Sequence, residues 1–267
     1  KLISNEVKYT RLVATAACRQ ALNGREFIKR ARKESNLKLE IINPSEEARL
    51  AVIGSVGHLK PMTEQVLVVD IGGGSTELVW LDLTNVEAKN RKNSIMMMQS
   101  NQLRKKELDK LTGVKVVDWI SVPLGVVTLK DQYKDVDGDS AQFALMACHF
   151  EECLSTFKPY RELLDQKIDY FQMIGTSGTI TTIGASFLNL KKYDRNLVDG
   201  LELSTAQVLS VIQNYLNLGP IGRAEDKSIG KDRQELIMSG AAILQTLLRL
   251  WPTNRLSIAD RGLREGL

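Results

Sequence analysis

Short runs of apolar residues separated by polar turns recur along this chain and predict an α/β fold. Runs with the length and content of β-strands lie at 11–15, 37–42, 66–69, 78–81 and 170–174. The run at 66–69 is apolar throughout, which is typical of a strand that is buried on both faces. We expect two lobes, the first formed by residues 1–64 and the second by 65–255. The last segment, 256–267, is expected to return toward the first lobe.

Capping signals mark the predicted helices of the first lobe. Asn23 and Glu26 match a capping box, so a helix is expected to begin there. Its apolar residues would face inward, and they are Phe27, Ile28 and Ala31. After the strand at 37–42, Pro44 and Ser45 would break the strand and cap a helix over 46–52.

The second lobe is expected to contain longer helices. Apolar residues recur at helical spacing over 140–164, and a further helix is expected over 180–188. Asp232 and Glu235 would cap a helix that buries a set of apolar residues. That set is Leu236, Ile243, Leu244, Leu247 and Leu248. Residues 84–118 show no sustained period and predict a long insertion between strands.

Composition narrows the class of protein. The 267 residues are 43% hydrophobic and 25% charged, the balance of a globular chain. No apolar run reaches the roughly 18 residues that cross a bilayer, and the first ten residues lack the apolar core of a signal peptide. A cytoplasmic protein without a membrane partner is therefore expected.

The net charge and the numbers of cysteines and histidines argue against a zinc-type metal site and against DNA binding. The three cysteines lack metal-ligand spacing and are expected to be small core residues, while the two histidines are too few for an imidazole-rich metal site. The net charge of +4 is small for a nucleic-acid binder, so no DNA partner is expected. Between Glu87 and Lys110, seven basic residues outnumber three acidic ones. This basic stretch fits a solvated loop or an electrostatic guide for a long polyanion.

The segment from Asp70 to Glu77 carries the strongest local signal of chemistry. Gly72, Gly73 and Gly74 follow an apolar strand and precede Ser75 and Thr76. Glycines let backbone N–H groups turn together toward a phosphate. Because a second strand follows instead of a helix, the segment differs from a dinucleotide-binding or P-loop motif. Taken alone, a glycine-rich hairpin turn without a ligand remains an alternative.

A second candidate loop, Gly175–Thr179, stands between a predicted strand and a predicted helix. Here an anion would meet a helix N-terminus and hydroxyl groups, both of which favour negative charge. An ordinary strand-to-helix turn with a threonine cap is the alternative.

A third motif, Ser45-Glu46-Glu47, is typical of helix N-termini. From the residues alone, helix capping is favoured over catalysis.

Taken in order along the chain, the motifs resemble the exopolyphosphatase and guanosine pentaphosphate phosphatase family. They are AxxRQALN (16–23), EEARL (46–50), DIGGGSTE (70–77), Ser-x-x-x-Gly (121–125), GTSGT (175–179) and LREG (263–266). The resemblance spans nearly the whole chain. It implies a two-lobed, actin-like (ribonuclease H-like) fold and an enzyme that cuts the terminal phosphate from a polyanionic chain.

The resemblance also implies roles for individual residues. Glu47 matches the general base of the family, and Arg19 matches an arginine beside the cleft. Asp70 and Glu77 match carboxylates that hold Mg²⁺ or its waters. The expected phosphate-binding residues are Gly72, Gly73, Gly74, Ser75 and Thr76 in the first loop, and Gly175, Ser177, Gly178 and Thr179 in the second.

Family members begin with a further phosphate hairpin of the form DxGSNS, which this sequence lacks, so the first lobe is expected to be incomplete at its N-terminus. The expected function is release of terminal phosphate from inorganic polyphosphate, guanosine pentaphosphate or both. A non-catalytic sensor of polyphosphate or of an alarmone nucleotide, and an actin-like ATPase or kinase, are the alternatives. A homodimer is compatible with the sequence, which does not fix the oligomeric state.

Overall fold

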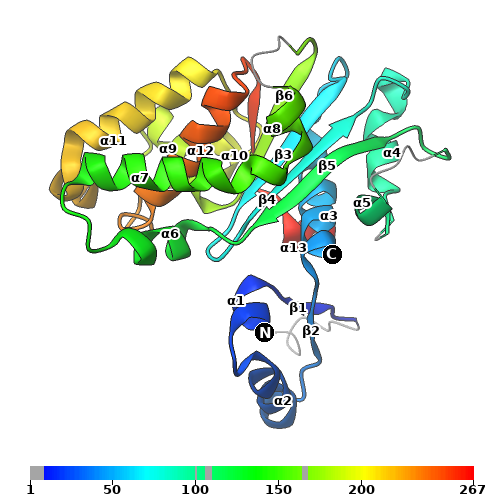
Figure 1. Cartoon of the computed structure of the whole chain (residues 1–267), viewed down its shortest axis with the longest axis horizontal. Coiled ribbons are helices and arrows are strands. Elements are labelled where there is room, and N and C mark those ends of the chain that lie inside the picture. The colour runs from blue at the N-terminus through cyan, green and yellow to red at the C-terminus, as the bar shows by residue number, and fades with distance from the viewer. Residues whose placement is uncertain (1–8, 100, 106–109, 164–167) are drawn as a thin grey trace.

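Buried strands with apolar side chains on both faces build a six-stranded sheet. In the computed structural model, which describes residues 9–99, 101–105, 110–163 and 168–267, helices cover both faces of this sheet (Figure 1). A small lobe with α1, β1, β2 and α2 lies to one side of it (Figure 1). The structure is thus α/β, as predicted.

The strands are β1 (Leu12–Ala14), β2 (Leu39–Ile41), β3 (Gln65–Ile71), β4 (Thr76–Asp82), β5 (Lys115–Val122), β6 (Phe171–Thr176), β7 (Glu202–Leu203) and β8 (Leu256–Ala259). The α-helices of the first half are α1 (Ala16–Gln20), α2 (Gly24–Ser35), α3 (Pro44–Ser55), α4 (Arg91–Met96), α5 (Gln102–Lys105) and α6 (Val126–Tyr133). Those of the second half are α7 (Asp139–Glu152), α8 (Lys158–Glu162), α9 (Gly178–Phe187), α10 (Arg195–Val198), α11 (Thr205–Glu225), α12 (Ile237–Leu250) and α13 (Leu263–Gly266). Short 3₁₀ turns are η2 (Val56–His58), η3 (Ala88–Asn90) and η4 (Cys153–Thr156).

The large sheet mixes parallel and antiparallel pairs in the order β5-β4-β3-β6-β8-β7. Strands β3 and β4 form an antiparallel hairpin, whereas β6 lies parallel to β3 on its other side and β8 lies parallel to β6. The carboxyl ends of β3, β6 and β8 therefore share one edge of the sheet, the edge at which α/β folds commonly bind ligands.

Alternating side chains of β3 supply two separate cores. Leu67, Val69 and Ile71 join the larger cluster, which includes residues of α7, α9, α11 and α12. Val66 and Val68 join the second cluster with Ala48 and Val52 of α3. This alternation follows from the two-residue period of a strand, and it fixes α3 on the face opposite α12.

Helix α3, which carries the predicted Glu46-Glu47 motif, is held at close range by α13. A Cβ at Gly54 would overlap the Gly262 carbonyl, and one at Gly266 would overlap the Leu50 carbonyl. Only glycine permits so close an approach of the two backbones. The C-terminal segment thus packs on α3, and the predicted boundary at residue 64 falls after a helix that itself packs on the large sheet.

The small lobe departs from two of the predictions. Strands β1 and β2 pair in parallel, but Phe27 of α2 is 44% exposed instead of facing inward. Asn23 is the N-cap residue of α2, yet its side chain makes no capping hydrogen bond, so the predicted capping box is absent. For α3, the cap is Asn43, whose side chain accepts from the Glu46 N–H, and not Ser45. Several short polar side chains near a helix start can act as its N-cap, and tertiary packing decides which of them does.

Other corrections concern longer segments. The helix predicted over 140–164 is divided into α7, η4 and α8, with Pro159 in the first turn of α8. The predicted insertion at 84–118 contains α4 and α5 and overlaps the start of β5, while its residues 100 and 106–109 lie outside the described part. Helix α12 begins at Ile237 without a side-chain cap, so Asp232 and Glu235 do not cap it.

The cysteines are also not core residues. Cys148 is exposed, and Cys18 and Cys153 are half-buried. None of the helices in the described part of the chain combines the length and apolar content that a membrane-spanning segment requires.

One buried side chain ties the entry of β3 to β6 and β8. Gln172, which is fully buried in β6, accepts hydrogen bonds from the Lys60 N–H (3.0 Å) and the Thr63 hydroxyl (2.6 Å). Its amide nitrogen donates to the His58 carbonyl (2.9 Å) and to the Ser257 hydroxyl (2.7 Å). All hydrogen-bonding groups of the amide are therefore satisfied.

We predict that Gln172→Leu lowers the free energy of unfolding by about 2–4 kcal/mol, because it leaves buried partners of the amide unsatisfied. Gln213→Leu is the matched control, since the exposed Gln213 side chain bonds Asn217 on the same helix, α11, and its loss should change stability by less than about 0.5 kcal/mol. Urea denaturation of both variants measures the difference. Equal stability of the two variants would show that the Gln172 network contributes little.

Candidate active site

The carboxyl ends of β3 and β6 bring the two predicted loops together. Asp70 lies opposite Glu77 in the antiparallel β3–β4 ladder, so both side chains emerge on the same face of the sheet. Asp70 is also in register with Thr176 of β6, and Ser177 follows directly. The Ser177 hydroxyl donates a short hydrogen bond to the Asp70 carboxylate. Thus the glycine hairpin and the GTSGT loop are adjacent.

The glycine hairpin is held mainly by its carbonyl groups, which leaves the amides of Gly73 and Gly74 available. The Gly72 carbonyl accepts from Val126 N–H (3.0 Å) and the Gly73 carbonyl from Val127 N–H (2.9 Å), both at the start of α6. A Cβ at Gly125 would overlap the Gly73 carbonyl oxygen at 2.6 Å, so glycine is needed for this approach. Within residues that the structure describes, no acceptor is found for the N–H of Gly73 or Gly74. These two amides can bind an anion.

The hairpin also faces the small lobe. A Cβ on Gly74 would lie 3.4 Å from the Ala16 side chain and 3.9 Å from the Gln20 side chain, both in α1. The hairpin tip and α1 are thus next to each other, and Arg19 belongs to the same short helix.

The second loop combines a strained residue with a helix N-terminus. Ser177 has φ of 77°, a left-handed conformation that non-glycine residues seldom adopt. It is the N-cap residue of α9, yet its side chain makes no capping bond and binds Asp70 instead. The Gly178 and Thr179 N–H groups precede the first intrahelical bond of α9, so they remain available to an anion. Such strain is frequent at functional sites.

Glu47 lies on the first turn of α3 and faces the two loops, whereas Glu46 pairs with Arg49. Arg19 Nη1 donates to Glu47 Oε2 at 2.6 Å and to the Ile42 carbonyl at 2.9 Å. Glu46 is bound by Arg49 through two contacts of 2.8 Å. Neither glutamate side chain caps the helix, because Asn43 does. Glu46 and Glu47 thus lie at a helix N-terminus, as their motif predicted, although the side chain that caps the helix is that of Asn43.

Three buried carboxylates influence one another at this site. Burial raises the pKa of Glu77 to about 8, and the charges of Glu47 and Asp70 add to the effect against the hydrogen bonds from Ser75 and Ser121. Burial likewise raises the pKa of Asp70 to about 6, opposed by the Ser177 hydrogen bond and reinforced by Glu47. Only close neighbours exert such effects, so Glu47, Asp70 and Glu77 face a common space.

The carboxylates offer oxygen ligands of the kind that a magnesium ion prefers. Oδ2 of Asp70 and Oε2 of Glu77 have no hydrogen-bond partner among the described residues, and both groups would gain from a neighbouring cation. No group of three or more His, Cys, Asp or Glu side chains suited to a metal is found in that part of the chain. Mg²⁺ commonly takes only one or two carboxylates, with waters and substrate phosphates completing its shell. The donor set therefore fits this ion.

Four predicted phosphate-binding residues have other roles in the structure. Thr76 is fully buried and donates to the Leu124 carbonyl (2.8 Å). Gly175 lies within β6, where a Cβ would collide with Ile180. The Gly72 N–H donates to the Ser75 carbonyl (3.0 Å), and the Gly72 carbonyl accepts from Val126 of α6. The Thr179 side chain packs against Gly240, so only its backbone N–H remains for an anion. The glycine motif thus mixes packing positions with binding positions.

Arg233 is a site residue that the sequence interpretation missed. Its guanidinium occupies the space in which a Cβ of Gly178 would stand, directly at the N-terminus of α9. No ion-pair partner of Arg233 is found within the described residues. The sequence pattern assigns its neighbours Asp232 and Glu235 as helix caps and gives Arg233 no role. Ser121 of the Ser-x-x-x-Gly motif donates to Glu77 at 2.8 Å, a contact that the motif does not indicate.

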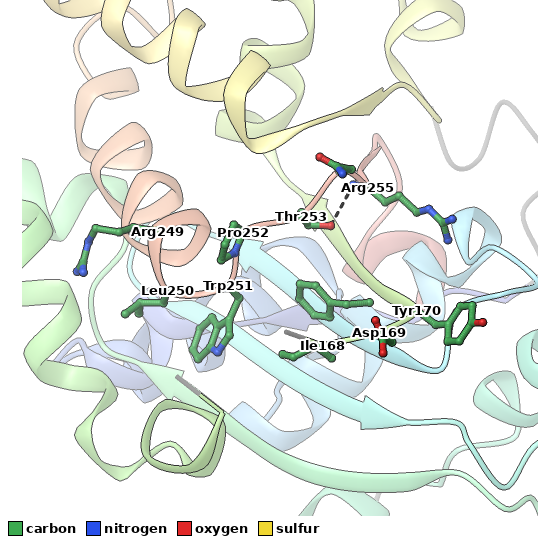
Figure 2. Close-up of a pocket in the computed structure, with 11 residues that line it drawn as sticks. Ile168, Asp169, Tyr170, Arg249, Leu250, Trp251, Pro252, Thr253 and Arg255 are labelled. Carbon is green, nitrogen blue, oxygen red and sulfur yellow. Dashed lines mark hydrogen bonds between the residues drawn. The ribbon is translucent and has the colours of Figure 1, made fainter. Parts of the chain in front are cut away.

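A separate cavity lies away from these residues. It has a volume of about 570 Å³ and is lined where α12 ends and β6 and β8 begin. Figure 2 shows Trp251 and Tyr170 toward opposite ends of it. None of the predicted site residues lines this cavity.

The comparison with protein families agrees with the site. Residues 2–267 match the Ppx/GppA phosphatase family. The chain therefore belongs to the Ppx/GppA phosphatase family, as the motifs predicted.

Solved structures place the chain in the same fold. A Ppx/GppA enzyme of Aquifex aeolicus is 28% identical with a TM-score of 0.72, and the match covers 99% of this chain and 76% of that one. An exopolyphosphatase-like protein is 25% identical with a TM-score of 0.77, covering 99% and 78%. An exopolyphosphatase of Cytophaga hutchinsonii has a TM-score of 0.77 at 20% identity, covering 99% and 75%, and shows the fold alone. The fold is thus of the actin-like ATPase type.

The raised pKa of Glu77 predicts a pH dependence of stability. Folded Glu77 has a pKa of about 8 against an ordinary value of 4.5, so the folded chain keeps a proton that the unfolded chain has lost. Its contribution is fully present below pH 4.5 and is lost as the pH rises through about 8. In metal-free protein we expect Glu77→Gln to remove much of this decline, up to about 4 kcal/mol, and Mg²⁺ to reduce it in the wild type.

Thermal unfolding between pH 5 and 9, with chelator and with Mg²⁺, measures this effect. Asp137→Asn, on an exposed turn, is the control and should follow the wild-type profile. If Glu77→Gln also follows that profile, folding does not raise the pKa of Glu77 enough to affect stability.

Proposed function

We propose that this chain is a phosphohydrolase that releases the terminal phosphate from inorganic polyphosphate or guanosine pentaphosphate, with Glu47 as general base. The observation that supports it best is the convergence of Glu47 with Asp70, Glu77 and two amide-lined loops at one edge of the sheet. Membership of the phosphatase family makes a phosphate-containing substrate the natural choice. A cytoplasmic location would suit either substrate.

The anion would be gripped from two sides. The Gly73 and Gly74 amides face it from the hairpin, and the first amides of α9 face it from the second loop with the positive end of the helix dipole behind them. Arg233 adds a formal positive charge beside Gly178. Such fixed donors stabilise the charge on the phosphoryl oxygens without reorganisation during the reaction.

Magnesium held by Asp70 and Glu77 would neutralise charge on the substrate phosphates. Such binding would also keep both carboxylates ionised in spite of their burial.

Glu47 would take the proton of the attacking water. Its Oε2 is held by Arg19, while no partner of Oε1 is found among the described residues. The free oxygen can accept a proton as the water oxygen bonds to phosphorus and the bridging P–O bond breaks. Arg19 fixes the direction of the carboxylate and would itself lie beside the substrate.

Glu47→Gln is expected to lower kcat for phosphate release by about 10²–10⁴-fold, because the amide cannot accept the proton. Binding of polyphosphate should change little, since the loops and Arg233 remain. Steady-state phosphate release from polyphosphate and from guanosine pentaphosphate, with and without Mg²⁺, provides the measurement.

The matched control is Glu46→Gln on the same helical turn. It loses a pair with Arg49 and should lower stability while kcat stays within a few-fold of the wild type. A Glu47→Gln variant as active as the wild type would refute the role of the base. If the wild type binds these anions but releases no phosphate, the sensor alternative is favoured instead.

A further inference from the structure

The cavity of about 570 Å³ at the end of α12 lies at the edge of the sheet opposite the candidate active site. Phe171 lines it at the start of β6, whereas Ser177 follows the other end of the same strand. The length of the strand separates the two places by about 20 Å. One small molecule cannot reach both, so a ligand of this cavity would bind in addition to the phosphate substrate.

Hydrogen bonds fix the walls of the cavity. On one wall, the Tyr170 carbonyl accepts from the Glu64 N–H at 3.0 Å. On the other wall, the Thr253 N–H donates to the Thr205 hydroxyl (2.9 Å), and the Thr253 carbonyl accepts from the Thr205 N–H (2.8 Å). The Arg255 N–H donates to the Thr253 hydroxyl at 3.0 Å. The cavity is therefore formed before any ligand binds, as is usual for small-molecule sites.

The cavity is lined largely by apolar and aromatic side chains, and one aromatic ring is available for stacking. Tyr170 is 50% exposed and has φ of 52°, a left-handed conformation that non-glycine residues seldom adopt. No contact between its ring and another aromatic ring is found among the described residues. Backbone strain of this kind is frequent where a side chain binds a ligand. The apolar lining residues are Ile168, Phe171, Leu250, Trp251 and Pro252.

Polar groups complement this ring. Arg255 is half-buried, and its guanidinium has no ion-pair partner within the part of the chain that the structure describes. Figure 2 shows its side chain extending toward the end of the cavity at which Tyr170 lies, whereas Arg249 lies at the other end. Arg249 is held in an ion pair. Asn254 is exposed and lines the cavity, as does Asp169, whose charge would oppose a ligand with many negative charges.

We propose that this cavity binds a nucleoside monophosphate, with the base stacked on Tyr170, the base edge hydrogen-bonded to Asn254 and the phosphate bound by Arg255. An exposed tyrosine ring stacks with any base, and an amide side chain both donates to and accepts from a base edge. The guanidinium fork matches the geometry of phosphate. Because one unpaired arginine stands near Asp169, a single phosphate fits better than a chain of them. Such binding is independent of the proposed hydrolysis at the other edge of the sheet.

Calorimetric titration of AMP, GMP and UMP into the protein tests this site. Tyr170→Gly removes the ring and suits the left-handed backbone, and Arg255→Ala removes the cation. The matched controls are Tyr9→Gly, at a tyrosine that is 92% exposed, and Arg161→Ala, at an exposed arginine outside the cavity.

We expect the wild type to bind at least one of the three nucleotides with Kd below about 1 mM. Tyr170→Gly and Arg255→Ala should each weaken that binding about tenfold, while both controls stay within about twofold of the wild type. Tyr170→Phe should bind like the wild type, because the ring remains. The nucleoside without its phosphate should bind the wild type and Arg255→Ala equally.

Absence of binding for all three nucleotides at about 5 mM would overturn the proposal. Affinities of Tyr170→Gly and Arg255→Ala equal to those of their controls would also overturn it, because the nucleotide would then bind elsewhere. Either result leaves the proposed phosphohydrolase untouched, since both side chains lie away from Glu47 and the two loops.

Discussion

The burial of three carboxylates close to one another is the constraint on which this site depends. Glu47, Asp70 and Glu77 come from a helix and two strands, and each is at least nine-tenths buried. Burial and proximity raise the pKa values of Asp70 and Glu77, so the fold holds an arrangement that is unfavourable without positive charge nearby. A divalent cation, Arg19 and the loop amides would supply that charge. The same arrangement that costs stability would prepare the site for a phosphate substrate.

Close backbone packing creates the arrangement. The hairpin approaches α6 because Gly125 has no side chain, and this contact occupies the hairpin carbonyls and leaves amides free. On the other face, Gly54 and Gly266 let α13 pack closely against α3, whose first turn carries Glu47. Ser177 has a left-handed backbone conformation, and its hydroxyl donates to Asp70 instead of capping α9. Packing far from the ligand thus decides which groups the ligand would meet.

The sequence predicted the parts of the fold that depend on local pattern. The apolar run of β3, the glycine hairpin and the family followed from the order of motifs. What failed depended on tertiary competition: Asn43 and not Ser45 caps α3, and Phe27 stays exposed. Within the motifs, the Thr76 hydroxyl donates to the Leu124 carbonyl inside the protein. A sequence motif does not reveal such a contact. Arg233 reaches Gly178 from more than fifty residues away, a contact that only the fold reveals.

The most direct measurement is a crystal structure of the protein with Mn²⁺ in place of Mg²⁺ and with bound phosphate, in which anomalous scattering locates the metal. We expect the ion within about 2.3 Å of a carboxylate oxygen of Asp70 or Glu77. The phosphate should contact the amides of Gly73 and Gly178, with Glu47 facing its phosphorus. A metal bound away from both carboxylates, or a phosphate that leaves both loops empty, would contradict the central claim that these groups form one phosphate-cleaving site.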